Sequence, residues 1–329
     1  MTFQAYLIEQ HGHGVSARFV DFSEDRLDPG ELTIRVRHSS VNYKDALAVT
    51  GAGRIIRRYP CIGGIDLAGE VIASVDPRFT PGQPIVATSF DIGVAHHGGF
   101  AQRARLPADW VLPLPAGLSP WEAMALGTAG FTAALGIQRM EDNGLTPAAG
   151  PVLVTGATGG VGGLAIDMLA GRGYQVVALT GKATQADYLK HLGATEIMLR
   201  DTLPLDRVRP LDTAKWAGVV DNLGGPVLSW AASTCRQGAT IASIGLAASG
   251  ELNMTVMPFI LRGVSLLGID SGYWPMPGRA RLWARMASDL KPRHLGEIAR
   301  SIAFAELPDA CARLIAGGGH GRLVVDLPD

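Results

Sequence analysis

The chain has 329 residues, a formal net charge of -1 and three cysteines. This length exceeds the usual size of one domain, so we expect two domains. The nearly balanced charge gives no overall attraction to nucleic acid or to an anionic membrane. Cys61, Cys235 and Cys311 are far apart and show neither a metal-binding nor a disulfide pattern, which fits a reducing cytoplasm. The N-terminus has no signal-peptide pattern, and no apolar run is long enough to span a membrane, so we expect no membrane partner.

The first 120 residues have the pattern of a β-rich domain. Short apolar or alternating runs, such as 32–36 and 69–73, are separated by turn-forming clusters at 28–30 and 80–82. A helix is expected to begin near Ser119, because serine is a favourable N-cap and Pro120 suits the first helical position.

A glycine-rich turn then marks a dinucleotide-binding motif. The apolar strand 152–154 leads into Thr-Gly-Ala-Thr-Gly-Gly-Val-Gly at 155–162 and a helix-patterned run, and a second strand is expected at 175–179. Strand, turn and helix in this order present backbone N–H groups and a helix N-terminus to a pyrophosphate. Ala157 stands in place of the first glycine of the commonest fingerprint. The alternative is a glycine turn in an α/β domain that binds no nucleotide.

The end of the second strand favours NADPH over NADH. NAD-selective sites usually place a carboxylate there, which would repel a 2′-phosphate. This chain has Thr180, Gly181 and Lys182 instead, and Arg200 follows the expected third strand at 196–199. A hydroxyl, a backbone N–H and cations suit a phosphate. Alternatively, either cation is an ordinary solvated surface charge.

Further strands are expected at 217–221, 239–243 and 264–268, which would complete a six-stranded, doubly wound parallel sheet. The tail from about Ser271 contains helix-like runs at 279–289 and 306–316 and a strand at 322–325, and we expect it to return to the first domain.

Several long motifs in order carry a family resemblance over the whole chain. They are Val-Asn-Tyr-Lys-Asp at 41–45, 51–57, 60–69, the turn at 157–162, 180–182, 257–263 and 268–271. The sequence resembles the medium-chain dehydrogenases/reductases, in the zinc-independent, quinone-oxidoreductase-like branch, and within it the acrylyl-CoA reductase (NADPH) group.

The resemblance implies an α/β fold with two domains. A GroES-like β-rich catalytic domain would comprise residues 1–120 and 271–329, a Rossmann-fold NADPH domain would comprise 121–270, and the assembly would be a homodimer. The residues expected at the cofactor are Tyr43, Ala157, Thr158, Gly159, Gly160, Val161, Gly162, Thr180, Gly181, Lys182, Arg200, Leu246, Ile260 and Ser271.

Ligand chemistry argues against zinc. Zinc alcohol dehydrogenases of this superfamily supply a cysteine thiolate and a histidine, which hold the metal that polarises an alcohol. This chain has Asn42 and Asp66 at those places. His96 and His97 are adjacent, and neighbours on an extended segment point opposite ways. We therefore expect no metal and a hydrogen-bonded or surface role for both histidines.

Without a metal, conjugate reduction is the chemistry that we expect. Hydride adds to the β-carbon of an activated alkene, charge moves to the carbonyl oxygen, and a proton reaches the α-carbon. Tyr43 is the candidate donor of a hydrogen bond or proton, Asn42 supplies a neutral dipole, and Asp45 orients the neighbourhood. The alternative for Tyr43 is a ring that only packs against the nicotinamide.

Arg54, Arg57 and Arg58 form a basic cluster suited to the phosphates of a CoA thioester, unless they are only solvated. The most specific expectation is reduction of a short 2-enoyl-CoA, acrylyl-CoA to propionyl-CoA. The alternatives are a quinone or enone reductase and, from a different class, a nucleic-acid-binding or structural protein that binds the nucleotide as a ligand. The charge pattern does not support that last alternative.

Overall fold

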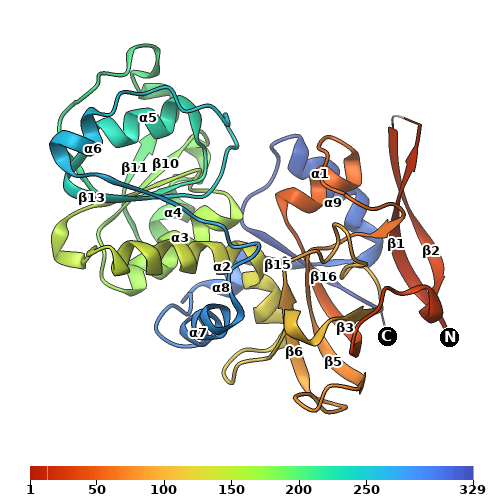
Figure 1. Ribbon diagram of the computed structural model, residues 1–329. Coiled ribbons are helices and arrows are strands. Elements are labelled where there is room, and N and C mark those ends of the chain that lie inside the picture. Colours follow the sequence, from red (N-terminus) through yellow and green to blue (C-terminus); the bar gives the residue numbers. More distant parts are fainter. Residues whose placement is uncertain (13, 329) are drawn as a thin grey trace. The chain divides into compact units, whose positions relative to one another are not determined.

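The structure is a computed structural model that describes residues 1–12 and 14–328 (Figure 1). The chain forms two compact units. Unit 1 comprises Met1–Thr128, Gly272–Ala287 and the described residues from Leu295 onward, and unit 2 comprises Ala129–Ser271 and Ser288–His294. The long segment α2 (Pro120–Asp142) is interrupted at Gly127, whose φ of 49° and ψ of -155° are not helical. The expected limits of the catalytic domain (1–120 and 271–329) and of the cofactor domain (121–270) stay a prediction.

Unit 1 contains two sheets. The smaller has the order β2-β1-β4, with β1 at Thr2–His11, β2 at Gly14–Ser23 and β4 at Cys61–Ile62. The larger has the order β15-β16-β3-β5-β6-β8, and β7 also pairs with β3. Its strands are β3 Leu32–Val41, β5 Asp66–Ser74, β6 Pro84–Thr88, β7 Arg103–Leu106, β8 Val111–Pro113, β15 Ala299–Ala303 and β16 Arg322–Asp326. The tail therefore joins the sheet begun by the N-terminal part.

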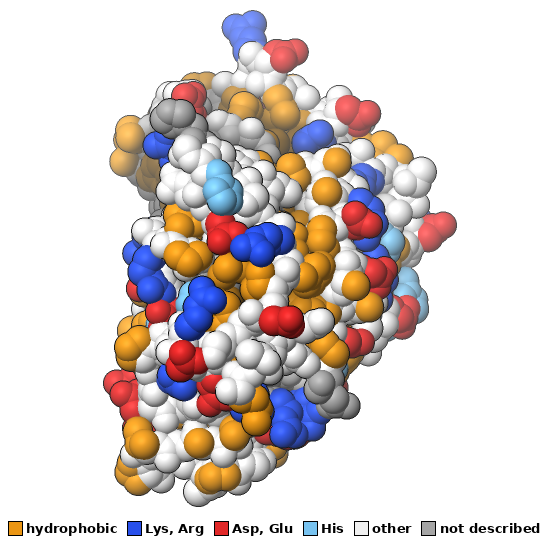
Figure 2. Space-filling model, turned by 90° about the vertical axis from the view of Figure 1, so that its right-hand side faces the viewer, with side chains coloured by type: hydrophobic (Ala, Val, Ile, Leu, Met, Phe, Trp, Pro, Cys, Tyr) orange, Lys and Arg blue, Asp and Glu red, His pale blue; other side chains and the backbone are white. Residues whose placement is uncertain are grey.

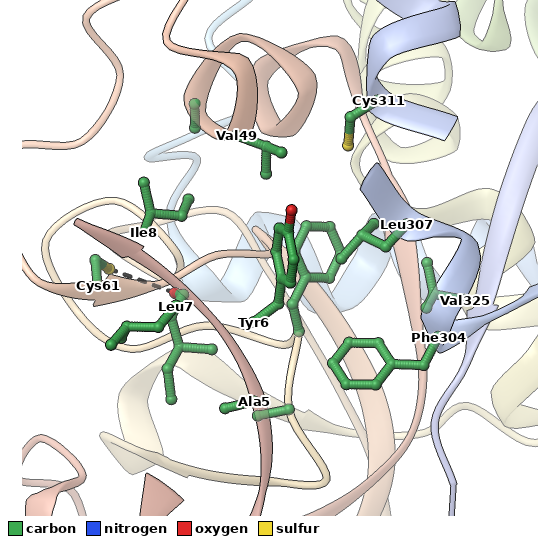
Figure 3. Close-up of a cluster of buried hydrophobic side chains, with 14 of the residues drawn as sticks. Ala5, Tyr6, Leu7, Ile8, Val49, Cys61, Phe304, Leu307, Cys311 and Val325 are labelled. Atoms are coloured by element: carbon green, nitrogen blue, oxygen red, sulfur yellow. Dashed lines mark hydrogen bonds between the residues drawn. The ribbon is translucent and has the colours of Figure 1, made fainter. Parts of the chain in front are cut away.

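Two helices of unit 1 cover one of its cores. Helices α1 (Tyr43–Thr50) and α9 (Leu307–Ile315) lie side by side (Figure 1). In Figure 3, Val49 of α1 and Leu307 and Cys311 of α9 approach the ring of Tyr6, which rises from β1. This buried apolar contact fixes the body of α1, and with it the place of Tyr43 at the first position of the helix. The unit also contains α7 (Met276–Met286) and α8 (Leu295–Ile298).

Unit 2 is a parallel sheet with helices on both faces. Its strand order is β11-β10-β9-β12-β13-β14, which in chain order is 3-2-1-4-5-6, the arrangement of dinucleotide-binding domains. The strands are β9 Val152–Thr155, β10 Val176–Thr180, β11 Ala194–Leu199, β12 Trp216–Asp221, β13 Cys235–Ser243 and β14 Ser265–Gly268. Every residue of β12 is buried, as a strand covered on both faces requires. The six strands expected from the sequence are confirmed.

The helices of unit 2 are α3 (Gly160–Gly171), α4 (Ala186–His191), α5 (Gly225–Ser233) and α6 (Met257–Arg262). Figure 1 shows α5 and α6 on one face of the sheet and α3 on the other. Strand order reverses between β9 and β12, and ligands of such sheets bind beyond the carboxyl ends of the strands at this point.

Candidate active site

The glycine turn lies at the carboxyl end of β9 and opens α3. Gly156 has a φ of 60°, so the left-handed turn occurs one residue before Ala157, where the fingerprint has its first glycine. A Cβ added to Gly162 would lie 2.4 Å from the carbonyl oxygen of Gly156. Gly162 therefore allows α3 to approach the turn, while Gly159 is the exposed N-cap of the helix. The fingerprint spacing, which begins at Ala157, does not single out Gly156.

A cationic group lies at the end of β10. Thr180 pairs with Leu199 of β11, so the residues that follow each strand are neighbours. The backbone N–H of Lys182 donates to Oγ1 of Thr180 over 3.0 Å. A Cβ on Gly181 would lie 3.4 Å from Nη2 of Arg200, so this guanidinium lies beside the loop. Thr180, Gly181, Lys182 and Arg200 are therefore neighbours at this edge of the sheet, and their contact with a 2′-phosphate stays a prediction.

A buried carboxylate ties the ends of β9 and β12 at the point where strand order reverses. Oδ1 of Asp221 accepts from Oγ1 of Thr155 over 2.8 Å, and its Oδ2 accepts the N–H of Gly224 over 2.9 Å. Burial raises the pKa of Asp221, while these hydrogen bonds lower it. The sequence predicts Asp221 at the end of a strand and indicates no further role for it. Its only signal was a carboxylate ending an apolar strand.

Three other residues expected at the cofactor lie elsewhere in unit 2. Leu246 and Ile260 are 69% and 71% exposed. Ser271 accepts a hydrogen bond from Oγ1 of Thr132 over 2.7 Å. Their expected contact with the cofactor stays a prediction.

In unit 1, Tyr43 is exposed while the two residues expected to assist it are buried. Tyr43 is the first residue of α1 and is 52% exposed. The N-cap Asn42 donates from its backbone N–H to Oδ2 of Asp45 over 2.8 Å and from Nδ2 to the same oxygen over 3.0 Å. Oδ1 of Asp45 accepts the N–H of Ile65 over 2.9 Å. Asn42 and Asp45 thus fix the start of the helix that carries Tyr43.

Asp66, the first residue of β5, is the centre of this buried network. Its Oδ2 accepts from Nδ2 of Asn42 over 2.8 Å, from Oγ of Ser40 over 2.7 Å and from the N–H of Thr128 over 2.9 Å. Thr128 also donates its hydroxyl to Oδ1. A fully buried carboxylate with this many donors is stabilised in one orientation.

The guanidinium of Arg322 neutralises part of the charge in the network. Arg322 opens β16, and its Nη2 lies 3.9 Å from Oδ2 of Asp66. Burial and the charge of Asp66 raise the pKa of Asp45 to about 7. Burial lowers the pKa of Arg322, and the two carboxylates oppose that shift. The sequence predicts Arg322 at the start of a strand and indicates no further role for it. The signal was a charged residue at the start of an apolar strand.

The donor atoms of this network do not suit a metal ion. Asn42 is a neutral amide whose oxygen and nitrogen both have partners, and the Asp66 oxygens accept four hydrogen bonds. His96 contacts the carbonyl oxygen of Arg105 through Nε2, whereas Nδ1 of His97 accepts the N–H of Ile62. Burial lowers the pKa of His97 to about 4. Each histidine thus has its own protein partner, as expected from the sequence.

The three arginines of the basic cluster differ in their surroundings. Arg57 forms an ion pair with Asp91 and donates to the hydroxyl of Tyr273 over 2.8 Å. Arg58 pairs with Asp28 and donates to the carbonyl oxygen of Ala95. Arg54 is exposed and forms no hydrogen bond or ion pair with another described residue. Arg54 is therefore the cation of the cluster most available to an anionic ligand.

A groove of about 740 Å³ lies elsewhere in unit 1, lined by Phe19, Ile302, Phe304 and neighbouring residues. It includes none of the residues expected from the sequence. We therefore do not assign it to the candidate site. Among the described residues, none of the helices is both long and apolar enough to cross a membrane.

The sheet order and the glycine turn define a dinucleotide-binding protein. Comparison with protein families agrees. Residues 28–116 match the alcohol dehydrogenase GroES-like domain, and residues 160–288 match the zinc-binding dehydrogenase family. The donor atoms described above do not fit the metal in that second description.

Three similar proteins cover nearly the whole chain. The acrylyl-CoA reductase AcuI of Ruegeria pomeroyi is 48% identical over 301 residues, which are 92% of this chain and 91% of that protein. YhfP of Bacillus subtilis, provisionally named a quinone oxidoreductase, is 48% identical over 99% of both chains. Its crystal structure with NAD bound has a TM-score of 0.96 at 47% identity, covering 99% of this chain and 100% of that one.

The third is the yhdH oxidoreductase of Salmonella enterica in complex with NADP. It has a TM-score of 0.96 at 44% identity and covers 99% of this chain and 100% of that one. The chain belongs to the medium-chain dehydrogenase/reductase superfamily, in the zinc-independent branch with acrylyl-CoA reductases and quinone oxidoreductases. The family and the fold expected from the sequence are thus confirmed.

Proposed function

We propose that this protein reduces the C=C bond of a short 2-enoyl-CoA with NADPH, and that acrylyl-CoA is its substrate and propionyl-CoA its product. The observation that carries the proposal is the 48% identity with an acrylyl-CoA reductase across 92% of the chain. The local geometry supports it. An exposed tyrosine stands on a helix whose start is fixed by buried groups, and the site supplies no donor set for a metal.

The reaction needs a hydride, a proton and stabilisation of the charge on the thioester oxygen. When bound, the nicotinamide supplies the hydride to the β-carbon. The Tyr43 hydroxyl hydrogen-bonds the carbonyl oxygen where negative charge develops, or delivers the proton to the α-carbon. Asn42 and Asp45 act indirectly, by holding the start of the helix that carries Tyr43. Both are buried and hydrogen-bonded to each other at the start of α1.

NADPH is the cofactor that the second unit suits best. Lys182 and Arg200 provide positive charge beyond β10, and Thr180 provides a hydroxyl at the same edge. No carboxylate occupies positions 180–182 to repel a 2′-phosphate. The Salmonella relative was crystallised with NADP, whereas the Bacillus relative was crystallised with NAD. Both cofactors therefore belong in the assay.

The cluster of Arg54, Arg57 and Arg58 is our candidate for binding the phosphates of CoA. Arg54 contributes an uncompensated charge, while Arg57 and Arg58 keep side chains about half exposed beside their carboxylate partners. Guanidinium groups bind phosphates in a bidentate manner, and ion-paired ones still have N–H groups to donate.

The assembly is proposed to be a cytoplasmic homodimer in which residues 1–120 and 271–329 form the catalytic domain and residues 121–270 form the cofactor domain.

A quinone or enone reductase is the second candidate, because a relative that covers 99% of the chain is named a quinone oxidoreductase. A nucleic-acid-binding role has no support. Basic and acidic side chains are interspersed on the face of unit 1 that Figure 2 shows.

Steady-state turnover tests these candidates directly. Acrylyl-CoA, crotonyl-CoA and a quinone are each assayed with NADPH and with NADH. We expect the highest kcat/KM for acrylyl-CoA with NADPH. A preference for the quinone would replace the proposal with the second candidate, and absence of turnover with all three would contradict both.

A further inference from the structure

Arg322 contacts three consecutive residues that immediately precede Tyr43. Its Nη2 donates to Oγ of Ser40 over 2.9 Å, and its Nη1 donates to the carbonyl oxygen of Val41 and to Oδ1 of Asn42, each over 3.0 Å. Nε donates to the carbonyl oxygen of Ala125 over 3.2 Å. The side chain is almost fully buried, with a residue exposure of 4%. Its hydrogen bonds are thus concentrated on the end of β3 and the N-cap of α1.

The sheet register explains why this residue reaches that place. Strand β16 pairs with β3 in antiparallel fashion, with Leu323 opposite Val41 and Val324 opposite Ser40. Arg322 is the next residue and therefore lies where β3 ends and α1 begins. The apolar strand that follows it holds its backbone in the sheet, since Val324 and Val325 are fully buried.

Arg322 also determines which way the Asn42 amide faces. Oδ1 accepts from Arg322, while Nδ2 donates to the carboxylates of Asp45 and Asp66. The reversed amide would set NH₂ against the guanidinium and its oxygen against two carboxylates, so every one of these hydrogen bonds would be lost. The guanidinium and the two carboxylates together leave one arrangement for the residue that precedes Tyr43.

We propose that Arg322 is a positioning residue for Tyr43, which acts by holding residues 40–42 and the Asn42 amide in the arrangement that fixes the first turn of α1. This inference rests on the proposed role of Tyr43 in reduction. The inference differs from a purely stabilising role in one expected result. Loss of Arg322 should displace Tyr43 and lower the rate of the chemical step, even where the protein is folded and binds its cofactor.

The first test compares kinetics of Arg322→Ala with wild type. Misplacement of a reacting group by about 1 Å can cost on the order of 100-fold in rate, so we expect kcat to fall about 10- to 100-fold. The Kd for NADPH should change much less than kcat, because Arg322 contacts only residues of unit 1, whereas the cationic loop at residues 180–182 and Arg200 belong to unit 2. Millimolar methylguanidinium should restore part of kcat by entering the vacated site. Arg322→Lys should retain part of the activity, since an ammonium is a cation without the planar fork.

Arg262→Ala is the matched control. Arg262 also donates from a partly buried guanidinium to three backbone carbonyl oxygens, those of Asp212, Ser233 and Cys235, but all of them belong to unit 2. We expect this variant to lose stability, to keep kcat within about twofold at a temperature where it is folded, and to show no rescue by methylguanidinium.

A readout without turnover separates this inference from the proposed function. We would incorporate 3-fluorotyrosine and assign the ¹⁹F resonance of Tyr43 with Tyr43→Phe. The resonance should shift in Arg322→Ala and move back with methylguanidinium. If wild type does not reduce acrylyl-CoA, the proposed function fails and this spectrum still tests the positioning. An unchanged resonance in Arg322→Ala, or a kcat within twofold of wild type, would overturn the inference. Should that variant not fold, Arg322→Lys provides the same comparison.

Discussion

Nδ2 of Asn42 lies 2.8 Å from Oδ2 of Asp66, so the N-cap of α1 is bonded to the first residue of β5. This contact joins a helix start to a strand start 24 residues away. It places a neutral amide between two buried carboxylates. The same network fixes the start of α1, where Tyr43 is the first residue. The predictions below test the network, the cofactor loop and the substrate cluster separately.

Asp45 should make the protein less stable as the pH rises from about 4 to about 7. Its pKa of about 7 in the folded protein exceeds the ordinary value of about 3.9, so the folded state binds the proton more tightly in this window. Below the window the group is protonated in both states, and above it both states are ionised with the full penalty present. Measured by urea unfolding, the stability of wild type minus that of Asp45→Asn should therefore fall across the window. A flat difference for Asp45→Asn would contradict the prediction.

Gly127→Ala should destabilise the protein more than an ordinary left-handed glycine substitution. A Cβ at Gly127 would lie 2.6 Å from Oδ2 of Asp66 and 2.7 Å from Nη2 of Arg322. We expect a loss of about 1–2 kcal/mol from the backbone and a further 1–3 kcal/mol from crowding. Gly82→Ala is the control, since Gly82 has a φ of 84° with open space around it. Equal losses in chemical denaturation would show that the network yields without cost.

Lys182→Ala should weaken the binding of NADPH by about 1.5–3 kcal/mol, because a charge-assisted hydrogen bond to the 2′-phosphate is lost. The binding of NADH should stay nearly unchanged. Fluorescence titration with each cofactor measures this. Arg200→Ala should act in the same direction, and the exposed Lys190→Ala should affect neither cofactor. A comparable loss of both cofactors in Lys182→Ala would rule out a 2′-phosphate contact.

Arg54→Ala and Tyr43→Phe should fail in different ways. Loss of the exposed Arg54 cation should raise KM for acrylyl-CoA and barely affect a small enone that lacks CoA. Tyr43→Phe should lower kcat for both substrates, by about 100-fold or more if the hydroxyl is a general acid. Arg300→Ala removes another exposed cation of unit 1 and serves as the control. If Tyr43→Phe leaves kcat unchanged, solvent or another group delivers the proton.

Dialysis against a strong chelator should leave activity intact. The atoms of Asn42 and Asp66 that would face a metal are occupied by protein partners. Turnover and metal content are measured before and after dialysis. Activity that is lost and then restored by zinc would show that these residues rearrange to bind it.

The sequence alone was sufficient for the cofactor unit. Its strand, glycine turn and helix are consecutive, so apolar periodicity and glycine spacing report directly on local backbone geometry. The sequence could single out Tyr43 and Asn42 as candidates for the same reason, because they are neighbours within one motif. Even there, the turn uses Gly156 at positive φ, one residue ahead of the fingerprint position.

Only the tertiary structure could decide the partners of these residues. Arg322 bonds to Asn42 across 280 residues, and Arg57 reaches Tyr273 across 216. No local pattern encodes either pair, because sheet register and chain return bring them together. The same holds for charge: three arginines close in sequence look equivalent, yet Arg57 and Arg58 have carboxylate partners from distant segments and Arg54 has none among the described residues. Sequence specified which chemical groups are present, and folding decided which of them are neutralised, buried or left exposed.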